Sequence, residues 1–387
     1  MGRLRVMHFG SGGGKGVTRV VTELALGHAA GSAVETFAVF RRKRGKPLDR
    51  CFADALDAAS VPWAEVMPSP RIRTIAELRQ LIREFKPDVF VAHGYSEHIW
   101  GRRAALAEQV PHIVHAEHAH ERYSRPHLKE LSTLDRGTSA VVAVSEGVRA
   151  RLLQLGIPQA KTRVIHNGLA VERFAGAPPL EQRKREVLMV SRFASAKDHA
   201  TLIKALGLLK RRGIEIPLTL AGDGKWIHKW RVRLLVAIHG LSRSVKFLGH
   251  VDDVPTLLGK YRVVAFPTKR EGFGLVVIEA LLAGCAVVTS RIPGVDELIV
   301  HEETGFLHDA GCPESMAEGI VRALGQEGAE WAARGPSTAR ERFSLQRMTA
   351  DYENLFKELV GEGVRAPDEY PPRIDQKNRD ISSRQTA

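Results

Sequence analysis

Short apolar runs alternate with amphipathic stretches along almost the whole chain. In the first half the runs lie at 4–9, 34–40, 89–94, 112–117, 140–145 and 162–168, and in the second half at 186–192, 218–224, 245–250, 263–268 and 286–290. Helical periodicity fills the intervals, as at 17–30, 74–85, 146–155, 198–212 and 275–283. Because the runs are apolar without strict alternation, they are expected to be strands of buried parallel sheets. The pattern predicts an α/β protein with doubly wound sheets.

The alternation breaks in the middle of the chain and again near its end. Pro, Gly and charged residues replace the apolar pattern in AGAPPLEQRKRE (175–186), which predicts an N-terminal domain 1–174, a linker 175–185 and a C-terminal domain 186–343. Residues 344–360 read as one amphipathic helix, which we expect to pack back on the N-terminal domain. Residues 361–387 contain few large apolar residues, and a disordered tail is expected there. At 387 residues, each domain is long enough for its own core.

The spacing of the cysteines and the length of the apolar runs indicate in which cellular compartment the protein acts. The three cysteines, Cys51, Cys285 and Cys312, are far apart, which argues for a reducing compartment and against a disulfide framework or a zinc site. The N-terminus reads as a strand rather than a signal peptide. No apolar run approaches the roughly 20 residues of a membrane span. We therefore expect a cytoplasmic protein.

The chain is strongly basic, with a formal net charge of +13. The charge is clustered at 41–46, 71–73, 102–103 and 225–233. Such clusters attract nucleic acid, anionic lipid or phosphorylated small molecules, although each one also fits an ordinary solvated face. No known nucleic-acid-binding motif is present, so we expect no nucleic-acid partner. For the clusters of the first half, peripheral contact with an anionic membrane is the expectation beyond solvation.

A glycine-rich loop, GSGGGKG (10–16), follows the first predicted strand. It lacks the Ser or Thr that a Walker A loop needs after its lysine, and its glycine spacing misses the dinucleotide fingerprint. The remaining interpretation is a flexible loop whose backbone N–H groups lie at the N-terminus of a helix and contact an anion or a sugar. A plain tight turn is the alternative.

Two cations and a second glycine turn follow strands of the second half. Arg192 and Lys197 lie in the loop after the strand at 186–192, and Gly222 belongs to the turn AGDGK (221–225). Cations at the carboxyl end of a central strand point into the cleft and suit phosphate oxygens. Two solvated loop charges are the alternative.

The stretch EGFGLVVIE (271–279) places two carboxylates around glycines in apolar sequence. Gly272 and Gly274 let backbone N–H groups approach a ligand, and the N-terminus of the helix that follows favours a diphosphate. Glu279, one turn into that helix, suits a ribose diol, and Glu271 suits a sugar hydroxyl. Alternatively, Glu279 forms an ion pair and Glu271 is solvated.

With these motifs the chain resembles the retaining GT-B glycosyltransferases of family 4, also called glycosyl transferases group 1. EGFGLVVIE matches the E-x7-E motif of the family, and the segment VSRF…K (190–197) matches its diphosphate-binding Arg and Lys. The resemblance extends over residues 4–360. It implies two Rossmann-like domains that face each other across a cleft.

The resemblance also implies roles for individual residues. Arg192 and Lys197 would neutralise the leaving diphosphate, Glu271 would lie nearest the transferred sugar, and Glu279 would bind the ribose. Phosphate and sugar would contact the backbone at Gly272, Phe273, Gly274 and Leu275, with Gly222 nearby and with Gly13 and Gly14 closing over the diphosphate from the N-terminal domain.

The segment HIVHAEHAHER (112–122) carries four histidines. Their spacing does not suit a metal site. The family often has a cleft histidine after this strand, and His118 best matches its place, where it would bond a hydroxyl of the donor sugar. A structural histidine is the alternative.

The function implied is the retaining transfer of a hexosyl group from a nucleotide-diphosphate sugar to an acceptor hydroxyl, without metal or other cofactor. A glycan or lipid-linked acceptor at the inner face of the cytoplasmic membrane is expected, as in assembly of polysaccharide, lipopolysaccharide or glycolipid. The alternatives are an epimerase or hydrolase of nucleotide sugars with the same fold, and a non-catalytic nucleotide-sugar-binding protein.

Overall fold

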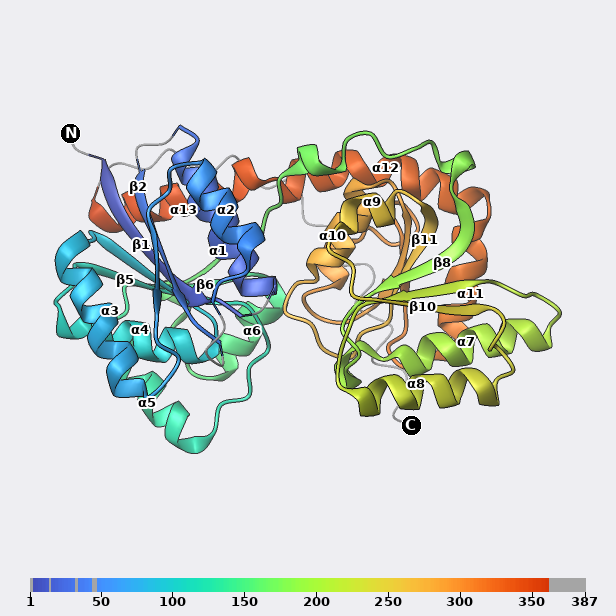
Figure 1. Ribbon diagram of the computed structural model, residues 1–387, viewed down its shortest axis with the longest axis horizontal. Helices are drawn as coiled ribbons and strands as arrows, with labels where there is room; N and C mark the ends of the chain where they lie inside the picture. Colours follow the sequence, from blue (N-terminus) through green and yellow to red (C-terminus); the bar gives the residue numbers. More distant parts are fainter. Residues whose placement is uncertain (1–2, 14, 32–33, 44–46, 362–387) are drawn as a thin grey trace.

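The computed structural model describes residues 3–13, 15–31, 34–43 and 47–361. These residues form two lobes, each built around one parallel sheet with helices on both faces (Figure 1). The last two long helices carry the chain from the C-terminal lobe back to the N-terminal one. The expected disordered tail, except for Gly361, lies outside the described residues.

The N-terminal sheet has seven strands in the order β3-β2-β1-β4-β5-β6-β7, and every pair is parallel. The strands are β1 (Leu4–Ser11), β2 (Val34–Arg41), β3 (Trp63–Val66), β4 (Val89–His93), β5 (His112–Glu117), β6 (Ala140–Ala143) and β7 (Thr162–Val164). The helices are α1 (Lys15–Ala29), α2 (Arg50–Ala58), α3 (Arg71–Phe85), α4 (Tyr95–Ala107), α5 (Arg125–Asp135) and α6 (Glu146–Gln154).

The C-terminal sheet repeats this plan with six parallel strands in the order β10-β9-β8-β11-β12-β13. The strands are β8 (Lys184–Val190), β9 (Leu218–Ala221), β10 (Val245–Gly249), β11 (Tyr261–Phe266), β12 (Ala286–Ser290) and β13 (Phe306–His308). The helices are α7 (His199–Arg211), α8 (Trp226–Ile238), α9 (Val254–Leu258), α10 (Leu275–Leu282), α11 (Pro313–Leu324), α12 (Gln326–Phe343) and α13 (Leu345–Val360).

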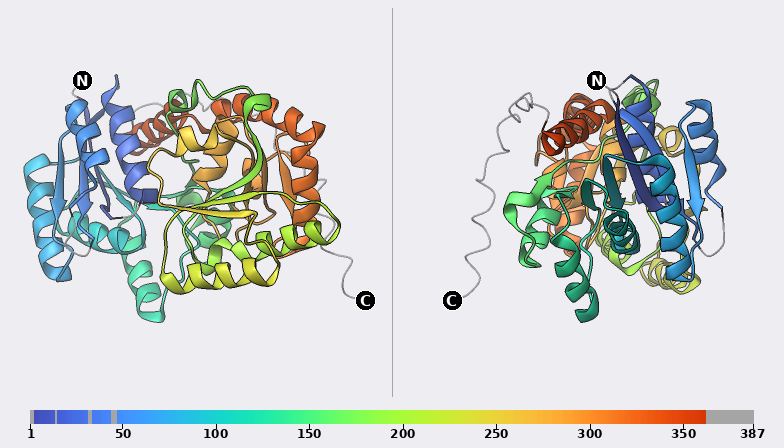
Figure 2. Two further views of the ribbon diagram at one scale, coloured as in Figure 1. Left: turned by 45° about the vertical axis from the view of Figure 1, so that its right-hand side comes forward. Right: turned by 90° about the vertical axis from the view of Figure 1, so that its left-hand side faces the viewer.

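Helix α13 belongs to the N-terminal lobe although it follows the C-terminal one in sequence. Its buried residues Met348, Tyr352 and Phe356 join the core cluster that contains Val6 and Leu24 of β1 and α1. Residues 344–360 therefore lie against the N-terminal domain, and the two views of Figure 2 show α13 beside it. The chain thus crosses twice between the lobes, which ties them together.

The predicted fold class, two doubly wound parallel-sheet domains of GT-B type, is confirmed. Two short strands, β3 and β13, were not predicted. They have four and three residues, and β3 (WAEV) is only partly buried, so neither contains a continuous apolar run long enough to signal a strand. Among the helices of the described residues, none combines the length and the apolar character that crossing a membrane requires.

Candidate active site

Strand order reverses direction at β1/β4 in the first sheet and at β8/β11 in the second. In doubly wound sheets ligands bind beyond the carboxyl ends of the strands at such a point, because the connections on either side diverge and leave a crevice. The loops that follow β8 and β11 contain Arg192, Lys197 and Glu271. Those that follow β4 and β5 contain Gly94 and His118.

Helix α10 begins without a side-chain cap. Its N-cap residue is Gly274, whose φ of 97° is in the left-handed region that side chains rarely adopt. No side chain accepts a hydrogen bond from the first turn. The positive end of the helix dipole and its uncapped backbone N–H groups therefore suit an anion.

Lys197 and Glu271 form an ion pair at the carboxyl edge of the second sheet. Lys197 ends the 3-10 turn after β8, and its Nζ lies 4.7 Å from the centre of the Phe266 ring. The other carboxylate oxygen of Glu271 accepts a hydrogen bond from the N–H of Gly272 at 3.3 Å. The fold therefore brings together the cation and the carboxylate that the sequence placed 74 residues apart.

Arg192 is exposed directly after β8, and its guanidinium forms no ion pair with any residue in the described ranges. Gly222, with a φ of 136°, faces the same turn. A Cβ at Gly222 would lie 2.0 Å from the carbonyl oxygen of Ser191. Only glycine therefore allows the ends of β8 and β9 to come this close, which keeps the Arg192 loop against the sheet.

Glu279 is buried and forms an ion pair with Arg19, which lies on α1 of the other domain. The Nε of Arg19 is also 3.6 Å from Glu23, and Glu23 is 3.6 Å from Arg173. Of the two readings of Glu279, the structure shows the ion pair, made across the cleft. Sequence reasoning missed Arg19 because its partner is 260 residues away.

The loop between β11 and α10 touches the N-terminal domain directly. The hydroxyl of Ser145 donates to the carbonyl of Gly272 at 2.7 Å. A Cβ at Gly272 would lie 2.1 Å from the carbonyl oxygen of His118. Nearby, Glu297 accepts from the N–H groups of Glu146 and Gly147 at the start of α6, at 3.0 and 3.4 Å. The two domains are therefore in contact at the candidate site.

The side chains of Phe273 and Leu275 hold this interdomain contact. Phe273 stacks on His166, with ring centres 5.3 Å apart, and meets Phe343 edge-on. Leu275 packs against core residues of both domains. The side chain of Phe273 is therefore buried in this contact, and that of Leu275 is half-buried in it.

A chain of hydrogen-bonded histidines runs from His118 into the N-terminal domain. Nε2 of His118 is 3.0 Å from Nδ1 of His93, and Nε2 of His93 is 3.0 Å from Nδ1 of His8. Burial lowers the pKa of all three, that of His118 to about 4, so they are neutral at pH 7.

Neutral imidazoles in a chain must all donate in the same direction. Nε2 of His8 is buried and has no hydrogen-bond partner among the described residues. Because an orphaned buried N–H is rarer than an unused lone pair, we assign the proton of His8 to Nδ1. His8 then donates to His93, and His93 donates to Nε2 of His118. The single N–H of neutral His118 is therefore at Nδ1. His118 is thereby set as a hydrogen-bond donor.

A second buried network adjoins this chain. His98, His115 and Glu117 present ligand atoms within 4.8 Å of one another, close enough to hold a metal ion. Arg102, a donor only, contacts Nδ1 of His98 at 3.0 Å, so Nε2 of His98 carries the proton and donates to Tyr123 at 3.1 Å. Tyr123 in turn donates to Glu117. The network therefore uses the lone pair of His98 that a metal would need.

Structure is available for only part of the glycine-rich loop. The N–H of Gly12 donates to the carbonyl of Arg41 at 2.9 Å, and Gly13 is exposed beside Lys43. Gly14 lies outside the described residues. The predicted closure of this loop over a diphosphate stays a prediction.

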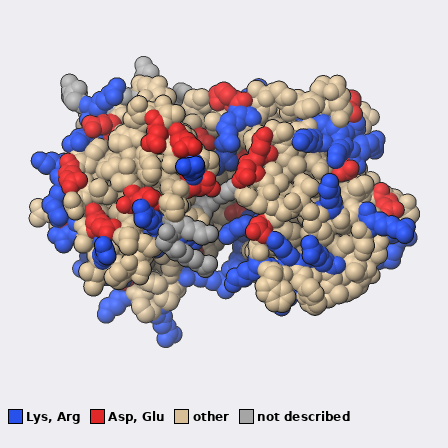
Figure 3. All heavy atoms as spheres, in the orientation of Figure 1, with Lys and Arg blue, Asp and Glu red and all other residues tan. Residues whose placement is uncertain are grey.

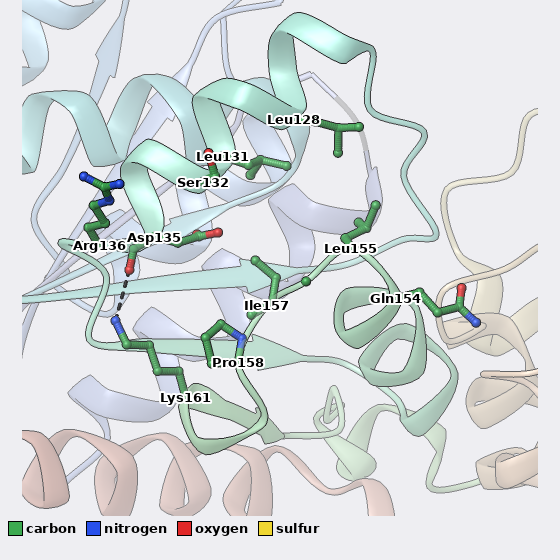
Figure 4. Close-up of a pocket in the computed structure, with 11 residues that line it drawn as sticks. Leu128, Leu131, Ser132, Asp135, Arg136, Gln154, Leu155, Ile157, Pro158 and Lys161 are labelled. Atoms are coloured by element: carbon green, nitrogen blue, oxygen red, sulfur yellow. Dashed lines mark hydrogen bonds between the residues drawn. The ribbon is translucent and has the colours of Figure 1, made fainter.

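A separate groove of about 500 Å³ lies in the N-terminal domain between α5 and residues 154–161 (Figure 4). Its lining combines the apolar side chains of Leu128, Leu131, Leu155 and Ile157 with polar and charged residues, and Lys161 donates to the carbonyl of Asp135 at 3.0 Å. None of the predicted site residues lines it.

Comparison with known proteins agrees with this geometry. The family described as "Glycosyl transferases group 1" matches residues 171–341, and "Glycosyltransferase Family 4" matches residues 14–173. The glycogen synthase of Mycobacterium tuberculosis is 30% identical over 311 residues, which cover 75% of this chain and 72% of that protein. The lipopolysaccharide core biosynthesis glycosyltransferase LpsE of Rhizobium meliloti is 27% identical over 363 residues, 91% of this chain and 99% of LpsE.

Solved structures show the same fold. Anabaena Alr3699/HepE in complex with UDP and glucose superposes with a TM-score of 0.80 at 21% identity, over 92% of this chain and all of that one. The family matches meet at the boundary between the two domains and together span residues 14–341. The chain therefore belongs to the glycosyl transferases group 1, or family 4, and is a glycosyltransferase with the GT-B fold.

Proposed function

We propose that the protein transfers a glycosyl group from a nucleoside-diphosphate sugar to an acceptor hydroxyl with retention of anomeric configuration. The observation that carries this proposal is the position of Lys197 and Glu271 beside the uncapped N-terminus of α10, at the switch point of the second sheet. Positive groups for a diphosphate and a carboxylate for a sugar are there side by side. The relative HepE has been solved with UDP and with UDP-glucose, which supports this class of donor.

The residues divide the work as follows. Arg192, Lys197 and the first turn of α10 stabilise the charge that develops on the leaving diphosphate, an electrostatic contribution of the kind that is often the largest in catalysis. Glu271 gives up part of its contact with Lys197 and accepts a hydrogen bond from the transferred sugar. Glu279, held by Arg19, accepts hydrogen bonds from the ribose diol. His118 donates a hydrogen bond to a sugar hydroxyl.

In the front-face step the bond between the anomeric carbon and the phosphate oxygen breaks. The acceptor oxygen forms its bond to that carbon on the same face, and its proton passes to the leaving phosphate oxygen. Since protein cations and backbone N–H groups supply the positive charge, we propose that no metal ion is required.

The relatives named above act in glycogen and lipopolysaccharide core synthesis, and a further one is a GDP-mannose-dependent phosphatidylinositol monomannoside mannosyltransferase. We accordingly propose a glycan or lipid-linked acceptor of the cell envelope, reached from the cytoplasmic side.

The first test is release of nucleoside diphosphate from a panel of nucleotide sugars, with oligosaccharide and lipid-linked acceptors. We expect Lys197→Ala and Glu271→Ala each to lower kcat/KM by at least about 100-fold, the size of a lost transition-state contact. Lys204→Ala, which removes an exposed lysine from the adjacent helix α7, serves as the matched control and should have no effect. EDTA should leave the rate unchanged.

Unchanged release in both variants would show that the site is misplaced. Turnover of no sugar in a broad panel would favour a nucleotide-sugar-binding protein, and inversion at the anomeric carbon, read from the proton coupling constant of the product, would exclude the front-face step.

A further inference from the structure

Helix α8 exposes a stripe of large apolar side chains. Trp226 is 74% exposed, Trp230 53%, Leu234 44% and Ile238 66%. Their four-residue spacing puts them on one face of the helix. Val232 and Val236, on the opposite face, are buried in the core of the C-terminal domain. Helix α8 therefore has a second apolar face that the fold leaves uncovered.

Cations flank the stripe. On the helix surface Arg233 comes three residues after Trp230 and Arg231 three residues before Leu234, on opposite sides of the stripe. The guanidinium of Arg233 lies 5.2 Å from the centre of the Phe247 ring. Both arginines and Lys225, which precedes the helix, are exposed and form no ion pair within the part of the chain that the structure describes. Only Lys229 in this segment is paired, with Asp223. The stripe is thus an apolar surface bordered by free positive charge.

The basic clusters of the first half differ in this respect, because carboxylates pair with most of their arginines. Glu130 pairs with both Arg71 and Arg103. The remaining pairs are Arg41–Glu97, Arg42–Glu65, Arg73–Glu77 and Arg102–Asp135. The described arginines of these clusters are therefore paired with carboxylates, whereas Arg231 and Arg233 on α8 form no ion pair among the described residues, which favours α8 as a membrane surface.

We propose that the outward face of α8 docks on an anionic lipid surface. Trp226 and Trp230 lie at the level of the headgroups, where amphipathic indole rings are most stable, and Arg231 and Arg233 contact lipid phosphates. In Figure 3, Lys and Arg occur along the lower edge of the C-terminal lobe, whereas Asp and Glu gather mainly on the other lobe and higher beside the cleft.

The N-terminal domain presents cations at the same edge of the molecule. Helices α5 and α8 both lie along the lower edge in Figure 1 and in the left view of Figure 2. In and beside α5, Arg122, Arg125, Lys129 and Arg136 are exposed. Docking by α8 therefore lets both domains face one membrane, as an enzyme with a lipid-linked acceptor needs. The need for a lipid-linked acceptor is the part of this proposal that rests on the proposed function.

Other occupants fit the stripe less well. A second copy packed face to face on α8 would set Arg231 and Arg233 of one chain near those of the other. Residues 362–387 carry five acidic and five basic residues, so they offer no surplus of negative charge.

The test is co-sedimentation of the full-length protein with vesicles of phosphatidylcholine containing about one third phosphatidylglycerol, compared with phosphatidylcholine alone. We expect binding to the anionic vesicles with a blue shift of tryptophan fluorescence, weakened at high salt. Trp226→Ser/Trp230→Ser should weaken partitioning at least about ten-fold. Arg231→Gln/Arg233→Gln should weaken it about ten-fold on anionic vesicles.

Ile72→Ser is the matched control, because Ile72 is 82% exposed and lies between the paired arginines Arg71 and Arg73. Its partitioning should equal that of the wild type. Unaltered circular dichroism and turnover of a water-soluble acceptor fragment would show that the variants are folded, and they separate failure of docking from failure of the proposed function.

The proposal is overturned if the wild type does not bind anionic vesicles, or if the α8 variants bind as tightly as it does. Loss of self-association or of an acidic protein partner in these variants, without any vesicle binding by the wild type, overturns it equally, since α8 would then be a protein interface.

Discussion

Glu279 is a carboxylate inside an almost wholly apolar helix, and the cation that makes its burial tolerable comes from the other domain. A buried charge costs several kcal/mol unless it is paired. The pair with Arg19 therefore both stabilises the contact between the domains and fixes the carboxylate that we propose to bind ribose. Arg19 is a positioning residue in this view.

Arg19→Ala leaves Glu279 without its cation. We expect a loss of about 3 kcal/mol in the free energy of unfolding, because the remaining charge stays buried. Affinity for the nucleoside diphosphate should fall as well, and Arg19→Lys should restore part of both losses. Urea unfolding and titration calorimetry measure the two effects.

Arg149→Ala is the control, because within the described ranges Arg149 pairs with Glu146 alone, on the surface of α6, and such pairs contribute at most about 0.5 kcal/mol. If Arg19→Ala lowered the free energy of unfolding no more than this control does, the ion pair across the cleft would not stabilise the fold.

At the scale of elements, the loop from β11 to α10 is shaped by its glycines. Gly274 ends the loop in a left-handed conformation and leaves the helix uncapped. Gly272 brings the loop against the backbone of the N-terminal domain. The same nine residues therefore contain the proposed sugar and ribose carboxylates and the contact between the domains.

Gly272→Ala should open the cleft. Its Cβ would lie 2.1 Å from the carbonyl oxygen of His118, a backbone atom that cannot move alone. Separation of the domains relieves this clash, so we expect a larger radius of gyration in small-angle scattering and weaker donor turnover. The free energy of unfolding should fall by no more than about 1–3 kcal/mol.

Gly259→Ala provides the comparison, since the nearest atom to its Cβ is at 3.4 Å, an ordinary contact, and its φ of −60° suits alanine. A large loss of stability in Gly272→Ala without any expansion would mean that the strain stays local and does not open the domains.

At the scale of the whole molecule, buried histidines are unevenly distributed. Burial lowers the pKa of His8, His28, His93, His98, His115 and His118 in the N-terminal domain, and of His199, His301 and His308 in the C-terminal domain. The folded N-terminal domain therefore keeps six imidazoles neutral at pH values at which the unfolded chain protonates them.

The N-terminal domain should lose stability first on acidification, because its six histidines with a lowered pKa outnumber Glu117 and Glu121, whose burial raises their pKa and acts in the opposite direction. Below an unfolded-state pKa of about 6.5, each such histidine takes up a proton on unfolding, so the free energy of unfolding falls by up to about 1.4 kcal/mol per pH unit per histidine. The loss begins near pH 6.5 and continues until the lowered pKa of each group is reached, about 4 for His118 and His28.

Urea unfolding between pH 7.5 and 5, followed by a probe in each domain, measures this dependence. His93→Gln should lower by about one the number of protons taken up on unfolding between these pH values. Equal loss of stability in both domains, or no loss above pH 5, would contradict the argument.

The sequence by itself determined the fold class and almost all strands of both sheets, and it singled out Arg192, Lys197, Glu271 and Glu279 as candidates for the site. These signals are local: apolar runs mark buried strands, and glycines beside charged residues mark strand-end loops. Strands as short as β3 and β13 gave no such signal.

Only the tertiary structure decided which charges meet. It paired Lys197 with Glu271, Arg19 with Glu279, and most arginines of the basic clusters of the first half with carboxylates. Among the described residues it left Lys225, Arg231 and Arg233 at α8 without an ion pair. It also set His118 at the end of a buried histidine chain. The physical reason is that burial and ion pairing depend on residues brought together from distant parts of the chain, which no local pattern records.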